Sequence, residues 1–259
     1  MNFFKSVFAT VVGIFLFMLL SFFLLIGLGA LLGSGEDKVK LKDNSVIQLD
    51  LAKINFDYAG KYESDSPFSS LMISKDKVGF IEVLKAIDAA KTDDKIKGIT
   101  IVNNQSGLGL AQSKELRDKL EDFKKSKKFV MAYANIYSQK EYYISSIADQ
   151  VYLNPAGEVD FKGLGSEMLF FKNFQDQTGL KMEIIRHGKF KSAVEPYLAQ
   201  EISPENREQV TVLLQSVWKT IVTDIAKNRN ISVAQLNTIA DGLLARTPQM
   251  ALQQKLVDK

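Results

Sequence analysis

The most prominent feature of the hydrophobic pattern is one long apolar run near the amino terminus. No charged residue lies between Lys5 and Glu36, and residues 7–32 are almost wholly apolar. As an α-helix this run would be about 39 Å long, which exceeds the roughly 30 Å hydrocarbon core of a bilayer. We therefore expect residues 1–36 to form a transmembrane anchor. A cleaved signal peptide is the alternative, although its apolar region is usually only about 7–15 residues long.

Beyond the anchor, short strand patterns alternate with helical ones. Period-two alternation or short apolar runs predict strands at residues 44–55, 95–103, 129–134 and 150–153. Apolar residues at helical spacing predict helices between strands, at residues 74–90 and 111–125. This order is typical of a parallel sheet covered by helices. Ligand sites in such folds lie at the carboxyl ends of the strands, here residues 103–109 and 135–141.

The remaining pattern predicts local elements with recognisable ends. We expect a turn at residues 154–157, a helix at 172–178 and a strand at 181–186. Ser203 followed by Pro204 predicts the start of a long amphipathic helix, and Ser232 predicts the start of a shorter one.

Composition narrows the function classes. Residues 37–259 are enough for one large or two small domains. The net charge is only +3, and basic residues form no stripe with interleaved aromatics, so we expect no nucleic-acid partner. The chain has no cysteine and one histidine, His187, and no metal-binding motif is present. We therefore expect no metal site and no other cofactor.

Lys191 is a candidate general base because a chain with no cysteine and a single histidine has few other side chains for this role. A lysine must lose its proton to act as a base, which requires burial or neighbouring cations to lower its pKa from about 10.4. Phe190, Ala193 and Val194 could supply that burial. The alternative is that Lys189 and Lys191 are solvated loop charges, and spacing alone favours it.

The run GKFKSAVEP at residues 188–196, followed by ISPENRE at 202–208, resembles a known family. It is similar to the amino-terminal half of the long, two-domain signal peptide peptidase A type of peptidase family S49. These are membrane-bound bacterial serine endopeptidases with a Ser-Lys dyad. The resemblance implies that Lys191 is the general base. Ser192, which could form a hydrogen bond near the lysine, and Gly188 are candidate supporting residues.

The same resemblance implies that the nucleophile is absent from this half. Aligning the tyrosine pair Tyr142-Tyr143 puts Gln139 where the family has its serine and Lys140-Glu141 where it has glycines. Residues 104–109 resemble the family's glycine-rich oxyanion loop only weakly. Ser138 adjoins the vacant position, but a shift of one residue turns a helical side chain by about 100°, so we expect it to cap a helix.

The resemblance also implies a fold, a location and partners. We expect an α/β fold of the ClpP/crotonase type, a spiral of β-β-α units, in residues 37–259. The implied activity is cleavage of remnant signal peptides, with the serine supplied by a second half and with oligomeric assembly. The implied location is the bacterial inner membrane, with a single span in the lipid bilayer and the catalytic domain on the periplasmic side. The alternative is a non-catalytic, membrane-tethered scaffold or assembly module of the same fold.

Overall fold

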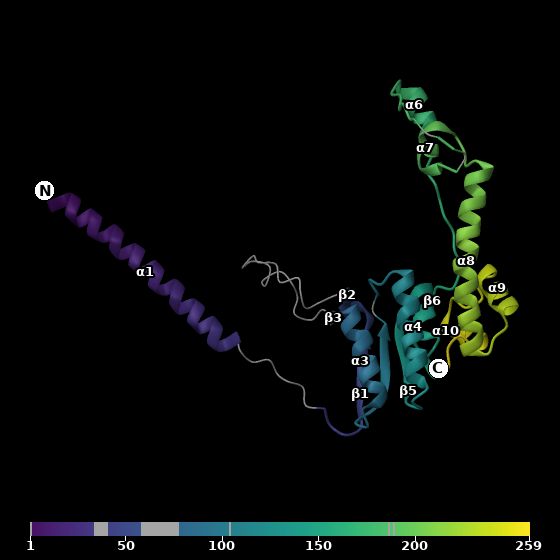
Figure 1. Ribbon diagram of the computed structural model, residues 1–259, viewed down its shortest axis with the longest axis horizontal. Coiled ribbons are helices and arrows are strands. Elements are labelled where there is room, and N and C mark those ends of the chain that lie inside the picture. The colour runs from purple at the N-terminus through teal and green to yellow at the C-terminus, as the bar shows by residue number, and fades with distance from the viewer. Residues whose placement is uncertain (1, 34–40, 58–77, 104, 186, 189) are drawn as a thin grey trace. The chain divides into compact units, whose positions relative to one another are not determined.

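A computed structural model of the chain describes residues 2–33, 41–57, 78–103, 105–185, 187–188 and 190–259 (Figure 1). The chain forms two compact units, Met1–Lys42 and Asp43–Lys259. The predicted boundary between residues 36 and 37 lies outside the described residues and stays a prediction.

The first unit is dominated by the helix α1 (Asn2–Gly33). Its Phe3–Gly27 stretch has a mean hydropathy of 2.7 and is long enough to cross a membrane. The helix buries no apolar face against protein, since its described side chains are almost all exposed. A helix that is apolar all round is suited to lipid rather than to water, so α1 is a candidate membrane span.

The second unit is built on a four-stranded parallel sheet in the order β1-β4-β5-β6. The strands are β1 (Ser45–Asp50), β4 (Ile96–Asn103), β5 (Phe129–Tyr137) and β6 (Gln150–Val159). A short 3₁₀ turn, η1 (Leu51–Lys53), leads from β1 into a second small sheet that pairs β2 (Ile54–Phe56) with β3 (Val78–Gly79). The predicted parallel α/β fold is confirmed.

Three helices connect successive strands of the main sheet: α3 (Phe80–Thr92), α4 (Leu110–Lys124) and α5 (Gln139–Ser145). The strands follow one another in both chain and sheet order, so right-handed crossovers place all three helices on the same face. Packing of α3 on α4 and of α4 on α5 agrees with a single layer (Figure 1). The strand residues beneath this layer are apolar and buried: Leu49, Ile99, Ile101, Val130, Ala132, Ala134, Val151 and Leu153.

The opposite face of the sheet is left uncovered by the described residues of this unit. Strand residues that alternate with the buried set are exposed or half-buried, namely Val46, Gln48, Thr100, Val102, Phe129, Met131, Tyr133 and Tyr152. We call these eight residues the open face. Parallel sheets are normally covered on both faces, so a sheet with an exposed face departs from the usual arrangement.

The carboxyl-terminal part adds six helical elements. They are α6 (Lys172–Thr178), η2 (Ser192–Val194), α7 (Glu195–Leu198), α8 (Pro204–Arg229), α9 (Val233–Asp241) and α10 (Pro248–Gln253). The predicted caps are confirmed: Ser203 Oγ accepts the Asn206 N–H and Ser232 Oγ accepts the Gln235 N–H. Residues 172–198, here called the arm, place α6 and α7 together at the amino-terminal end of α8 (Figure 1).

Three local predictions were wrong. The helix predicted from residue 74 begins at Phe80, because Val78 and Gly79 pair with β2, while residue 74 itself lies outside the described residues. Residues 154–157 continue β6 rather than turning. Residues 181–185 form no strand, and residue 186 lies outside the described part.

Candidate functional site

A cavity of about 690 Å³ lies where β4 and β5 end, as the strand order predicted. Its walls come from the loop after β4, here Asn103 to Gly107 without the undescribed residue 104, and from the segment that joins β5 to α5. This is the end of the sheet at which parallel α/β proteins place their ligands.

A reciprocal capping box starts α5 beside this cavity. Ser138 Oγ accepts the Glu141 N–H at 3.4 Å, and Glu141 Oε2 accepts the Ser138 N–H at 3.3 Å. Ser138 is therefore the helix cap that the sequence predicted. Its hydroxyl oxygen is engaged by the backbone of its own helix.

Gln139, at the predicted vacant nucleophile position, is bonded to a neighbouring loop. Its Nε2 donates to Gly163 O at 2.8 Å, and its Oε1 accepts the N–H groups of Gly163 at 2.8 Å and Lys162 at 3.1 Å. Gly163 has a φ of 85°, which a residue with a side chain rarely adopts. The Gln139 side chain thus fixes a glycine turn, a role that the sequence analysis missed.

Lys140 and Glu141 hold the loop on the other side of α5. Lys140 Nζ donates to Ser106 O at 3.0 Å and to Leu108 O at 2.6 Å. Glu141 is buried, and its Oε1 accepts the Ser106 N–H at 2.6 Å. The capping-box spacing from Ser138 to Glu141 was the signal available in the sequence, but it does not reveal the contacts with Ser106.

Tyr142 and Tyr143, the pair used to align this segment with the family, are both buried in α5. Tyr142 OH donates to Leu256 O at 2.7 Å, and Tyr143 OH donates to Asp224 Oδ2 at 2.6 Å. Burial raises the pKa of both phenols above the ordinary value, so both stay protonated donors at physiological pH. Their role is to anchor α5 rather than to perform acid–base chemistry.

The predicted base Lys191 lies in the arm, directly before η2. It is exposed within this chain, and the apolar cover expected from its neighbours is not formed, because Phe190 and Ala193 are exposed and Val194 is half-buried. Ser192, the first residue of η2, is half-buried. Gly188 is exposed, and its φ of 98° requires a glycine at that position.

The arm nevertheless anchors the segment that carries Lys191. Glu195 is 4% exposed, and its Oε2 accepts a hydrogen bond from the buried Asn206 Nδ2 at 2.5 Å. Gln175 Nε2 donates to Tyr197 O at 2.8 Å, and the ring of Tyr197 stacks on Phe171. No role for Glu195 or Asn206 was predicted from the sequence, although both lie inside the two motifs that carry the family resemblance.

Lys191 and Gln139 lie on different segments of this unit. Gln139 begins α5 at the end of the main sheet, and Lys191 begins η2 in the arm. His187 is exposed near Lys191. In the described part of the chain, no group of three or more His, Asp or Glu side chains is placed to hold a metal ion.

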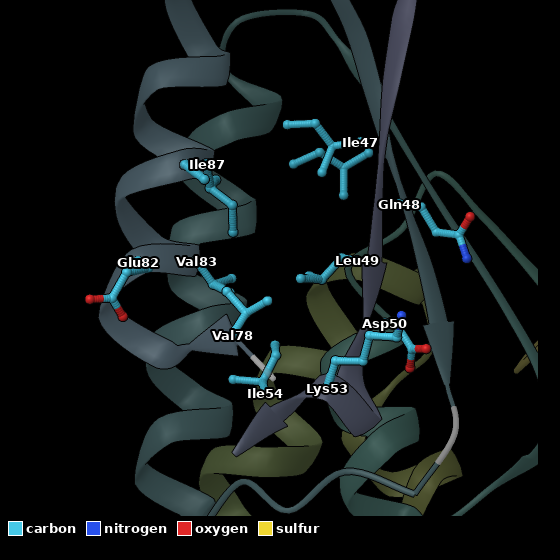
Figure 2. A pocket seen from close by; sticks show the side chains of 12 residues that line it. Ile47, Gln48, Leu49, Asp50, Lys53, Ile54, Val78, Glu82, Val83 and Ile87 are labelled. Carbon is cyan, nitrogen blue, oxygen red and sulfur yellow. The ribbon is translucent and has the colours of Figure 1, made fainter. Parts of the chain in front are cut away.

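A second cavity, of about 390 Å³, lies away from these residues between β1 and α3 (Figure 2). Figure 2 shows Ile47, Leu49, Val83 and Ile87 forming its apolar interior, with Asp50, Lys53 and Glu82 around it. Its lining includes neither Lys191 nor Gln139 and no serine, so the chemistry predicted from the sequence does not belong here.

Comparison with known proteins gives one family match. The profile described as "Peptidase family S49" matches residues 122–259, which include α5, the arm and the Lys191 motif. "Protease 4" of Haemophilus influenzae is 38% identical over 156 residues, 60% of this chain and 25% of that protein. "Protease 4" of Salmonella typhi is 34% identical over 185 residues, 68% of this chain and 30% of that protein.

A plant protein is also similar. "Serine protease SPPA, chloroplastic" of Arabidopsis thaliana is 30% identical over 129 residues, which cover 50% of this chain and 19% of that protein. The matched region thus spans less than a third of each of these three relatives.

Among solved structures, an enoyl-CoA hydratase/isomerase family protein from Silicibacter pomeroyi is similar over 76% of this chain and 94% of that one. The sequence identity is 14% and the TM-score is 0.26. At that score the assignment of an α/β fold depends on the parallel sheet itself.

Proposed function

Because the chain belongs to peptidase family S49, as a member of its signal peptide peptidase A group, we propose that it is the base-bearing half of a membrane-anchored serine endopeptidase that degrades remnant signal peptides. The observation that carries the proposal is the uninterrupted Lys191 motif in a chain whose position 139 is a glutamine. The serine is then supplied by a second half of the protein, in line with relatives that extend well beyond the matched residues.

In the proposed mechanism, neutral Lys191 takes the proton from the serine hydroxyl as its oxygen attacks the scissile carbonyl. It then returns this proton to the leaving amine. Lys191 is exposed in this chain, so in this proposal the apolar cover that keeps it neutral comes from the second half. Ser192 and Gly188 support the lysine, the first through its hydroxyl and the second through its turn.

Exposed apolar residues of the arm support such packing. They include Leu169 just before the arm and Phe174, Leu180, Met182, Ile185 and Phe190 within it. A cluster of this kind is typical of a surface that is covered in the assembled protein. Together with the open face, it favours contact with a second half and with further copies of the chain in a homo-oligomer.

The proposed location is the bacterial inner membrane, with α1 as a single span and the second unit on the periplasmic side. The support is the apolar α1 and the family membership. Peptides released from exported proteins would then reach the enzyme from the bilayer.

Substitution of Lys191 in the protein that contains both halves tests the proposal. We expect Lys191→Ala to lower kcat/KM on a synthetic signal peptide by about 10³-fold, the usual scale of a lost general base. Lys191→Arg should be equally inactive, because arginine keeps the charge but stays protonated. Lys181→Ala, an exposed lysine of the same arm, is the matched control.

A non-catalytic scaffold is the second candidate, and the glutamine at position 139 favours it. Unchanged cleavage by Lys191→Ala would leave only that role. Purified residues 38–259 should cleave nothing without the second half, and turnover by this fragment alone would refute the division of labour.

A further inference from the structure

Three consecutive side chains at the start of α5 each bond a loop, and two of them, Lys140 and Glu141, line the cavity at the end of β4 and β5. Gln139 bonds the turn at Gly163, while Lys140 and Glu141 bond the loop at Ser106. These contacts bridge 24 to 35 positions of sequence, so they determine where the two loops lie relative to α5.

The Ser106 amide has an unusual partner. Its N–H donates to a buried carboxylate oxygen of Glu141 at 2.6 Å, at a cavity wall rather than within a strand or helix. A backbone N–H next to a cavity at the end of a parallel sheet is a donor that could bind a carbonyl or carboxylate oxygen from a ligand. Here an oxygen of the chain's own side chain occupies that donor.

Lys140 holds the same loop through its carbonyl groups. Its ammonium binds the carbonyl oxygens of Ser106 and Leu108, so both the donor and acceptor of the Ser106 peptide region are engaged from α5. Hydrogen bonds to ionised groups are stronger than neutral ones. The loop is therefore held by two charge-assisted contacts of opposite sign.

We propose that the Ser106 amide is a carboxylate receptor whose built-in occupant is Glu141, and that Lys140 and Glu141 are positioning residues that keep this receptor filled. A filled receptor has no donor left for the charge that develops on a scissile carbonyl oxygen. For catalysis this consequence rests on the proposed function: this half would then contribute a base and a shaped wall, and oxyanion stabilisation would come from the second half.

Hydrogen exchange of the full chain in detergent tests the receptor without any substrate. We expect Glu141→Ala to speed exchange of the Ser106 amide about tenfold or more, because the amide loses its charged acceptor. Glu141→Gln, which keeps the shape and one acceptor oxygen, should give a smaller increase. Glu121→Ala and Glu121→Gln, at a carboxylate that pairs with Lys227 on the outside of α4, are the matched controls.

Adding formate distinguishes a carboxylate receptor from a purely structural role of Glu141, because formate should affect Ser106 exchange only if the amide binds carboxylates. In Glu141→Ala, added formate should slow Ser106 exchange again, because a small carboxylate can take the position of the lost one. Chloride at equal ionic strength should not. Lys140→Met should speed exchange at residues 105–108 while leaving Gly163 unchanged, with Lys114→Met as the control.

The proposal is overturned if Ser106 exchange rises less than about threefold in Glu141→Ala. It is also overturned if the rise is shared by the Glu121 variants or if formate and chloride act alike. None of these results depends on peptidase activity, so failure here leaves the role of Lys191 untouched, and loss of that role leaves the receptor standing.

Discussion

Arg117 joins three helices through one buried guanidinium. Its side chain is 1% exposed and donates to Tyr143 O and Ser146 Oγ next to α5, and to Asp224 O and Asn228 Oδ1 of α8. Burial lowers the pKa of this guanidinium, while Tyr143 and Asp224 favour its charged form. One side chain thus donates to four acceptors.

Arg117→Met should therefore destabilise the second unit strongly. Methionine fills much of the volume but removes all four hydrogen bonds that the buried guanidinium donates, which should cost about 3 kcal/mol in the free energy of unfolding. Urea denaturation of residues 43–259 measures the loss. Lys119→Met, on the more exposed side of the same helix, should change stability by less than about 1 kcal/mol.

Asp258 attaches the end of the chain to β6. Its carboxylate pairs with Arg229 and accepts the Val151 N–H at 2.7 Å, and its own N–H donates to Val151 O. Burial raises the pKa of this carboxyl, but the hydrogen bonds from Arg229 and Val151 outweigh burial and leave the pKa below its ordinary value.

The pH dependence of stability follows from the sign of that shift. A carboxyl with a lower pKa in the folded chain adds stability above its unfolded pKa of about 3.9, and this contribution is lost as pH falls through the folded value. Asp258→Asn should thus be less stable than the parent at pH 7, and the two should converge below about pH 4. Denaturation curves across this range check the expectation, and a gap that persists at acid pH would contradict it.

At the scale of elements, features that depend on neighbouring residues were predicted correctly, and features that depend on distant contacts were not. The helix starts at Ser138, Ser203 and Ser232 could be predicted, because a cap and its N–H partner lie within three residues. The buried strands were equally readable from their apolar runs.

The wrong predictions depend on contacts between distant residues. Residues 154–157 were expected to turn, yet Gly157 lies in β6, where an added Cβ would come within 1.9 Å of Asn135 O. Residues 181–185 have a strand pattern, but in the described part of the chain no strand pairs with them. The secondary structure of both segments depends on whether a neighbouring strand pairs with them, and the local sequence pattern does not contain that information.

The features of the candidate site also differ in how far the sequence predicts them. The motif around Lys191 and the glutamine at 139 were recognisable from the sequence. The bonds from Gln139 to Gly163 and from Glu141 to Ser106 were not, because each partner lies more than twenty residues away. Burial of Lys191 was expected from its neighbours, but in this chain Phe190 and Ala193 are exposed and Val194 is only half-buried.

The arm should depend on the buried pair formed by Glu195 and Asn206. Glu195→Ala leaves the Asn206 amide without this acceptor in a buried place, which should cost about 1–3 kcal/mol. The loss should be local, so exchange of residues 192–199 should rise while the strands of the main sheet stay protected. Glu208→Ala, at an exposed glutamate of α8, is the control. Equal exchange in both variants would contradict an anchoring role for Glu195.

At the scale of the whole molecule, the open face is the largest departure from the usual parallel-sheet arrangement. Phe129 and Tyr133 expose aromatic rings there, and Phe129 lies directly over Gly98. In solution such a surface favours contact with a second copy when nothing else covers it.

Residues 43–259 should therefore self-associate as their concentration rises. Tyr133→Lys should weaken that association, because a charge on the open face disfavours burial. Leu110→Lys, at an exposed apolar residue of α4, should leave it unchanged. Sedimentation velocity at several concentrations distinguishes the outcomes, and equal behaviour of the two variants would exclude the open face as the contact.

The same surface matters before the enzyme is complete. Until another protein surface shields the open face, its aromatic strand residues are accessible to any neighbouring chain. Overproduction of this half by itself should consequently yield inclusion bodies. Co-expression of the proposed second half in the same cell should raise the yield of soluble protein without any change to this sequence.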